Sequence, residues 1–187
     1  MSVRRHTLSV LVENQHGVLA KIAGLFSARG FNIDSLTVGP TADMTVSRMT
    51  IVVRADDKTL EQIVKQLDRI VTTIKVEDFA DIASIERELV LIKLKVKGTA
   101  RIEALQAVEV FRAQIVDFNP ESITVEATGS EEKLAAIVDA LKPFGILEFA
   151  RSGKIAMARG IVSTRTLAEA APAGTDAPKD EPEGSWL

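Results

Sequence analysis

The sequence predicts an α+β protein of two ferredoxin-like βαββαβ units followed by a disordered tail. Segments rich in β-branched residues alternate with segments whose apolar residues recur at helical spacing. This alternation occurs over residues 5–81 and again over residues 85–165, and we interpret each range as one domain. Residues 168–187 are rich in proline, alanine and acidic residues and are too polar to bury an apolar face, which predicts disorder.

In the first unit, turn-forming and capping residues separate the apolar segments. Gly30 is expected in a left-handed conformation just past the first helix, and Asp56 or Asp57 is expected to cap the second. The expected elements are strand 6–13, helix 18–29, strands 31–40 and 46–54 around the turn 41–45, a helix after Asp56 or Asp57, and strand 74–80. The residues expected to face the core from the two helices are Val18, Leu19, Ile22, Leu25, Phe26, Leu60, Ile63, Val64, Leu67, Ile70 and Val71.

The second unit repeats this order with little identity to the first. Ser130, followed by two acidic residues, is a typical start of a helix, and Pro143 and Gly145 are expected to end it. The expected elements are strand 88–96, helix 99–112, two strands around the turn Asn119–Pro120, the helix after Ser130, and strand 146–151. The inward residues of these helices are expected to be Ile102, Leu105, Val108, Phe111, Leu134, Ile137, Val138 and Leu141.

The composition excludes several classes of chemistry. The 187 residues include no Cys, no Tyr and two His, which removes thiol nucleophiles, disulfides and Cys-ligated metal sites. The formal net charge is −3 with acids and bases interspersed, so a nucleic-acid partner is not expected. The sequence has no apolar run long enough to span a membrane and no signal-peptide pattern, so we expect a cytoplasmic protein that is not a membrane component.

The loop from Asn14 to Leu19 is the most informative local feature. The N-terminus of a helix carries unpaired N–H groups that attract a carboxylate, and Gly17 allows close approach to the backbone. Asn14 and Asn32 could supply polar contacts, while Val18, Leu19 and Ile33 could line a small apolar pocket. Such a site suits a small apolar amino acid. The alternative is that Asn14 only stabilises a turn and that Gly17 only provides a positive φ.

Other constellations favour structural roles. The pair Asp56–Asp57 resembles a metal site, but helix capping explains it better because no third ligand has suitable spacing. His16 has no nucleophile or orienting acid at a recognisable spacing, so a solvated loop residue is the better interpretation. Gly98–Thr99 opens a helix like Gly17 does, without the flanking amides. Trp186 in the tail is interpreted as a solvated terminal residue, with docking as the alternative.

Several stretches resemble the regulatory small subunit of acetohydroxyacid (acetolactate) synthase. They are LSVLVENQHGVLAKIAGLFSARGFNIDSLTVGPT, VSRMTIVV, EQIVKQLDRIV, IERELVLIKLKV, FRAQIVDF and FARSGKIAMARG. The resemblance extends from about residue 5 to 162 and implies an N-terminal ACT domain followed by a second ferredoxin-like domain. Ala20 departs from relatives that carry Ser at this position.

The resemblance implies a regulatory function for a chain that is not itself an enzyme. It implies a bacterial homodimer formed through the ACT domains that acts in branched-chain amino acid biosynthesis. The small subunit is expected to activate a separate catalytic large subunit, and valine bound between the ACT domains is expected to inhibit that subunit by feedback. That subunit is expected to carry thiamine diphosphate, Mg²⁺ and FAD, whereas this chain is expected to hold no cofactor and no metal. Leucine and isoleucine stay open as effectors, since a methylene in an apolar pocket changes binding by only about 1–3 kcal/mol.

The family's effector positions fall on residues of the loop described above. They are Asn14, Gly17, Val18, Leu19, Asn32 and Ile33. The outer residues Gln62, Lys65, Gln66 and Arg69 of the second helix are candidates for contact with the catalytic subunit, with an ordinary solvated face as the alternative. Two rival functions are a stand-alone ACT-type amino-acid sensor, acting on another enzyme or a transcription factor, and a small enzyme that uses carboxylates.

Overall fold

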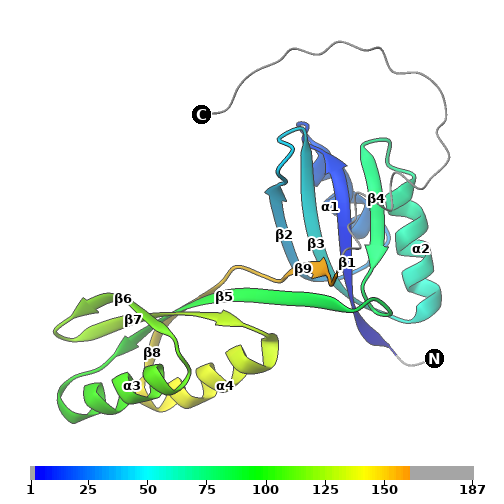
Figure 1. Ribbon diagram of the computed structural model, residues 1–187. Coiled ribbons are helices and arrows are strands. Elements are labelled where there is room, and N and C mark those ends of the chain that lie inside the picture. Colours follow the sequence, from blue (N-terminus) through cyan, green and yellow to red (C-terminus); the bar gives the residue numbers. More distant parts are fainter. Residues whose placement is uncertain (1–2, 161–187) are drawn as a thin grey trace.

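The computed structural model describes residues 3–160, which form two antiparallel sheets, each with two α-helices (Figure 1). The first sheet has the strand order β2-β3-β1-β4. Its elements are β1 (Arg4–Glu13), α1 (Val18–Ala28), β2 (Ile33–Pro40), β3 (Val46–Ala55), α2 (Asp57–Asp68) and β4 (Thr73–Asp78). This is the βαββαβ order that the sequence predicts, with β2 and β4 at the two edges.

Short local interactions fix where these elements begin and end. Gly17 precedes α1 with φ 82° and Gly30 follows it with φ 67°, both in the left-handed region that glycine tolerates. The carboxylate of Asp56 accepts a hydrogen bond from the Thr59 N–H at 2.8 Å, so Asp56 is the residue that caps α2. In the turn between β2 and β3, the Asp43 carboxylate accepts from the Thr45 N–H at 2.9 Å.

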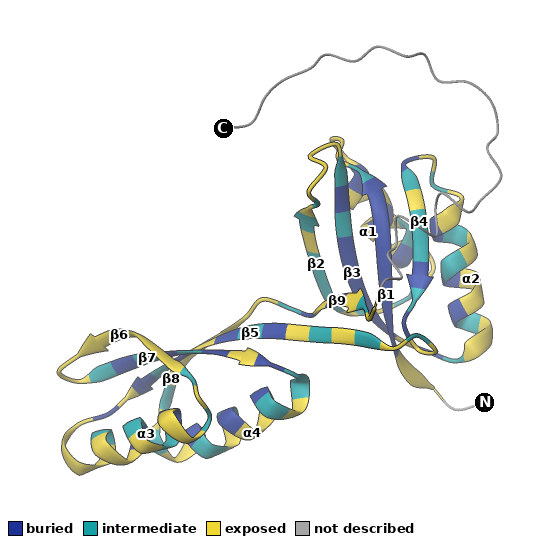
Figure 2. Ribbon diagram, viewed as in Figure 1, coloured by how far each residue is buried: buried dark blue, intermediate teal, exposed yellow. Residues whose placement is uncertain are grey.

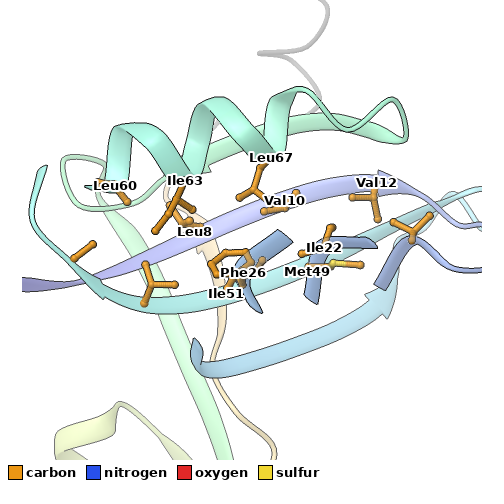
Figure 3. Close-up of a cluster of buried hydrophobic side chains, with 13 residues drawn as sticks. Leu8, Val10, Val12, Ile22, Phe26, Met49, Ile51, Leu60, Ile63 and Leu67 are labelled. Atoms are coloured by element: carbon orange, nitrogen blue, oxygen red, sulfur yellow. The ribbon is translucent and has the colours of Figure 1, made fainter. Parts of the chain in front are cut away.

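The core of the first unit lies between its sheet and its two helices (Figure 3). Alternate residues of β1 and β3 face the helices, since strand side chains point to opposite faces in turn. The fully buried side chains include Leu8, Val10, Met49 and Ile51 from the strands and Ile22, Phe26, Ile63 and Leu67 from the helices. The Phe26 and Phe31 rings pack edge to face with centroids 6.3 Å apart.

The second unit repeats this arrangement around the strand order β6-β7-β5-β8. Its elements are β5 (Ser84–Lys95), α3 (Gly98–Val110), β6 (Gln114–Asn119), β7 (Ser122–Gly129), α4 (Glu131–Leu141), the 3₁₀ turn η1 (Lys142–Phe144), β8 (Ile146–Arg151) and β9 (Ile155–Ala158). The Ser130 hydroxyl accepts from the Lys133 N–H at 3.4 Å, which confirms Ser130 as the cap of α4. The edge strand β6 is exposed along its whole length (Figure 2).

The long strand β5 joins the two units, and the sequence prediction misses part of it. Residues Glu88–Lys95 belong to the second sheet, whereas Ser84–Arg87 pair with β9 beside the first unit (Figure 1). The prediction starts this strand at residue 88 and assigns no strand to Ile155–Ala158. The cause is length: four residues with a single alternation give too weak a pattern to identify a strand by periodicity.

Three residues predicted to face the core are exposed. Leu19 is 46% exposed, Ile102 is 59% exposed and Val71 is 96% exposed. Val71 lies beyond the end of α2 at Asp68, so the helical spacing no longer applies to it. On α3, the small Ala104 takes the buried position with Val108, and Ile102 turns outward.

Some predictions fall outside the part of the chain that the structure describes. The tail at 168–187, including Trp186, lies there, as do residues 161–165 of the second predicted domain. Within residues 3–160, no helix combines the length and apolar character required to cross a membrane.

Candidate functional site

Gly17 opens α1 at an exposed loop that an anionic ligand can reach. Its φ of 82° places the residue in the left-handed region, and no described atom lies within 4 Å of where a Cβ would stand. Its carbonyl accepts the Lys21 N–H at 2.9 Å, which is the first hydrogen bond of the helix. The N–H groups that follow Gly17 therefore carry the partial positive charge of a helix N-terminus toward open space.

Asn14 fixes the loop to the turn that follows β2. Its backbone N–H donates to the Thr45 carbonyl at 2.7 Å, and its side-chain amide donates to the Met44 carbonyl at 2.9 Å. An open depression of about 600 Å³ lies beside it, lined by Glu13, Asn14, Gln15, Met44, Thr45, Val46 and Ile74. Asn14 therefore has the turn-stabilising role that the sequence left as an alternative, at the rim of a depression that a small ligand can enter.

Val18 and Leu19 differ in what they can offer to a ligand. The Val18 side chain is 3% exposed and packs in the core of the first unit, so the expectation that it lines a pocket is wrong. Only its backbone N–H can face a ligand at the loop. Leu19 is 46% exposed beside Gly17 and presents its aliphatic side chain at the surface.

Asn32 and Ile33 lie at the other end of the first unit from Gly17. Ile33 pairs with Val53, which pairs with His6 near the start of β1, whereas Gly17 follows the end of β1 at Glu13. The 11 residues of α1 separate the two groups by about 16 Å at 1.5 Å per residue. A pocket within one chain therefore does not include both Gly17 and Asn32, since a helix that crosses the sheet places its ends apart.

Asn32 is also engaged with charged neighbours. Its side-chain amide donates to Asp34 Oδ1 at 3.1 Å, and Arg54 Nε donates to Asp34 Oδ2 at 2.7 Å. The hydrogen bond from Arg54 is the main reason that the pKa of Asp34 is lowered. Ile33 is partly buried and packs against the core of the first unit.

The four candidate contact residues lie on α2 and, for Arg69, at the residue that follows it. Gln62, Lys65 and Arg69 are exposed and Gln66 is half-buried. Lys65 pairs with Glu61 one turn earlier at 2.5 Å, and both side chains are mostly exposed. This surface carries polar, solvated side chains, and its exposed Lys65–Glu61 pair contributes little to the stability of the fold.

The residues considered for metal binding or catalysis have structural roles. Asp56 caps α2 and its pKa is lowered first by the hydrogen bond from Thr59, while Asp57 forms an ion pair with Arg4 at 3.0 Å. His16 is exposed in the loop. Among residues 3–160, no group of three or more His, Asp or Glu side chains is arranged to hold a metal ion.

A groove that the sequence does not predict lies where the two units meet. Its volume is about 410 Å³, with walls formed by β2 and β3 on one side and by β5 and β9 on the other. Val38, Ile85, Ile155 and Met157 give it an apolar character and all four are more than two-fifths exposed. No local signal indicates this wall, because Ile155, Ala156 and Met157 are all apolar and show no alternation with polar residues.

Comparison with known proteins first defines the class of the chain. Residues 8–75 match the family model of the AHAS small subunit-like ACT domain, which accounts for the first unit. Residues 87–160 match the model described as the small subunit of acetolactate synthase, which accounts for the second.

Relatives that match the chain over both units support the same class of protein. The acetolactate synthase small subunit of Mycobacterium bovis is 52% identical over 160 residues, covering 86% of this chain and 95% of its own. The probable acetolactate synthase small subunit of Archaeoglobus fulgidus is 51% identical over 156 residues, covering 83% of this chain and 98% of its own. The crystal structure of the acetolactate synthase small subunit from Thermotoga maritima matches with a TM-score of 0.76 and 40% identity. The match covers 85% of this chain and 99% of that chain. The chain therefore belongs to the acetolactate synthase small-subunit family.

Proposed function

We propose that this chain is the regulatory subunit of an acetolactate synthase and that it acts on a separate catalytic large subunit. Membership of the small-subunit family carries this proposal. The open helix N-terminus at Gly17 can accept a carboxylate, which agrees with a role in sensing a small amino acid. A stand-alone amino-acid sensor is less well supported, because the relatives named above all carry the name of the small subunit.

The proposed effector is valine, bound between the ACT domains of two copies of this chain. β2 is an edge strand, and a second copy can pair with it about a twofold axis. Antiparallel overlap of two β2 strands places Asn32 of one chain near Pro40 of the other. Pro40 leads directly into the turn that Asn14 holds. Two copies can thus bring together the residues that α1 keeps apart in one chain.

The residue chemistry suits a free amino acid with an aliphatic side chain. The N–H groups after Gly17 offer a seat for its carboxylate, and the exposed Leu19 offers contact to its isopropyl group. The Asn32 amide of the second copy supplies a polar contact. Leucine and isoleucine fit the same description.

Valine bound between two copies can change how the copies are arranged and thereby change the activity of the catalytic subunit. A ligand shifts an equilibrium only by its difference in affinity for the two states, and typical coupling is about 1–3 kcal/mol. We propose that thiamine diphosphate, Mg²⁺ and FAD belong to the catalytic subunit, so this chain changes the rate only through contact.

Reconstitution of the two subunits tests the proposed function. The rate of acetolactate formation from pyruvate is measured for the catalytic subunit alone, with this chain, and with this chain plus valine. We expect this chain to raise the rate, valine to lower it, and this chain alone to give no turnover. An unchanged rate on adding this chain, or turnover without the catalytic subunit, would contradict the proposal.

A further inference from the structure

The segment that links β8 to β9 lies directly on the edge strand β2. The Thr37 hydroxyl donates to the Lys154 carbonyl at 2.7 Å, and the Lys154 N–H donates to the Ser35 hydroxyl at 3.2 Å. Gly153 has φ 85°, and a Cβ there would lie 2.8 Å from Ser35 Oγ and 2.9 Å from Thr37 Cγ2. Both the conformation and the space require glycine at this contact, so the second unit is seated closely on β2.

An ionic network crosses the same boundary. Arg5, at the start of β1, donates to Glu131 Oε1 in the first turn of α4. Lys154 Nζ lies 3.6 Å from Glu131 Oε2 and 2.6 Å from Glu86 Oε2, and the Lys154 side chain is only 11% exposed. The bond from Arg5 is the main cause of the lowered pKa of Glu131. The Glu131 carboxylate thus bridges a cation of the first unit and a cation of the β8–β9 link.

The network continues to Asp34 on β2, which is hydrogen-bonded to Asn32 just before the strand. Arg5 Nε lies 3.9 Å from Asp34 Oδ2, and Asp34 Oδ1 accepts the hydrogen bond from the Asn32 amide. Asp34 is therefore shared between Asn32, Arg54 and Arg5. We call Asp34, Arg5, Glu131 and Lys154 the seam network. It is a continuous set of polar contacts from the start of β2 to the first turn of α4.

We propose that the seam network couples the effector site to the orientation of the second unit, with Glu131 and Arg5 as positioning residues for regulation. The proposal rests on the proposed function, in which Asn32 touches the effector. A ligand on the Asn32 amide competes with Asp34 for that amide. Any change at Asp34 alters its attraction for Arg5, and Arg5 is the ion-pair partner of α4. Two sites are coupled when both bias one element that has two arrangements, and the seam is that element here.

The test uses Glu131→Arg in the reconstituted holoenzyme. The new guanidinium faces Arg5 and Lys154, so the seam loses its bridge while the candidate valine-binding residues are unchanged. We expect valine affinity, measured by calorimetry on the full chain, to stay within about threefold, while the concentration for half-inhibition rises at least fivefold, the lower range of typical coupling. The matched control is Glu132→Arg, which has the same charge change in the same turn of α4. The holoenzyme that contains Glu132→Arg should be inhibited by valine at the same concentration as the wild type.

Charge reversal on both sides tests the pairing directly. The double variant Arg5→Glu with Glu131→Arg restores opposite charges and should recover more valine inhibition than either single variant. If Glu131→Arg fails to fold by circular dichroism, Glu131→Gln is measured in its place. Normal inhibition in the folded Glu131 variant, equal loss in Glu132→Arg, or no recovery in the double variant would overturn the coupling. Absence of valine inhibition in the wild-type holoenzyme would instead overturn the proposed function.

Discussion

Gly17 is the residue on which the proposed effector site depends most directly. Replacing it with aspartate puts a carboxylate where the carboxylate of valine is expected to lie, so we expect the Kd for valine to rise at least about tenfold. Activation of the catalytic subunit should persist. The left-handed backbone conformation costs alanine roughly 1–2 kcal/mol and aspartate less, so Gly17→Ala is a stringent control for strain.

Calorimetry on both variants separates charge from strain. Gly17→Ala has space for its methyl group, because no described atom lies within 4 Å of that position, and it should bind valine within about threefold of the wild type. Unchanged valine binding by Gly17→Asp would place the effector elsewhere. Equal losses in both variants would assign the effect to the backbone rather than to the charge.

Asp34 makes a pH-dependent contribution whose sign follows from its partners. The hydrogen bond from Arg54 lowers its pKa from the usual 3.8 against the opposing effect of burial. A lowered pKa in the folded state means that the stabilisation is present above the unfolded pKa and is lost as the pH falls through the folded pKa. A carbon-detected NMR titration should place Asp34 below 3.8, and Arg54→Ala should raise it. Arg29→Ala, at the residue that follows α1, serves as the control. Titration of Asp34 at or above its usual pKa would refute the assignment.

At the scale of elements, periodicity predicts those helices and strands that are long enough for their apolar residues to recur several times. The helix capped by Asp56 and the strands on both sides of Asn119–Pro120 follow from capping and turn residues, and the structure confirms them. The strand Ile155–Ala158 has four residues and was missed, although it forms one wall of the groove and follows the Lys154 contact. Short elements depend on long-range pairing that a local pattern does not contain.

Helix α2 is the element that we expect to meet the catalytic subunit. Reversing Lys65 and Arg69 to Glu turns its outer side acidic without touching the buried Ile63 and Leu67. Reconstitution at increasing concentrations of the chain should then require at least about fivefold more of it to reach half-maximal activation, which is about 1 kcal/mol of lost binding.

The matched control for α2 has the same change in net charge at a different place. Reversing Lys97 and Lys142, two exposed lysines that also form ion pairs within the second unit, should leave the activation curve unchanged. Wild-type activation by the α2 variant would remove this helix as a contact, and loss in both variants would indicate a general effect of charge.

For the whole molecule, the fold could be predicted from the sequence, while the site could be predicted only in part. Gly17 and Gly30 mark the ends of α1, and both have the positive φ expected of them. Local patterns do not show that Gly17 and Asn32 lie apart within one chain, where a helix of 11 residues, about 16 Å long, carries the chain across the sheet between them. In the proposed dimer a second copy supplies Asn32 to the loop at Gly17, so the proposed site depends on the assembly.

Val38 provides the test of that assembly. It lies on the edge strand β2 with 46% of its surface exposed, so Val38→Glu places one carboxylate on each side of the proposed pairing. Charge on an edge strand opposes pairing between edges, and we expect sedimentation velocity to show a shift from dimer to monomer with a matching loss of valine binding. Val71→Glu is the control, since Val71 is 96% exposed beyond α2 and away from β2. If Val38→Glu stays dimeric at micromolar concentration and binds valine like the wild type, β2 is not the edge through which two copies form the site.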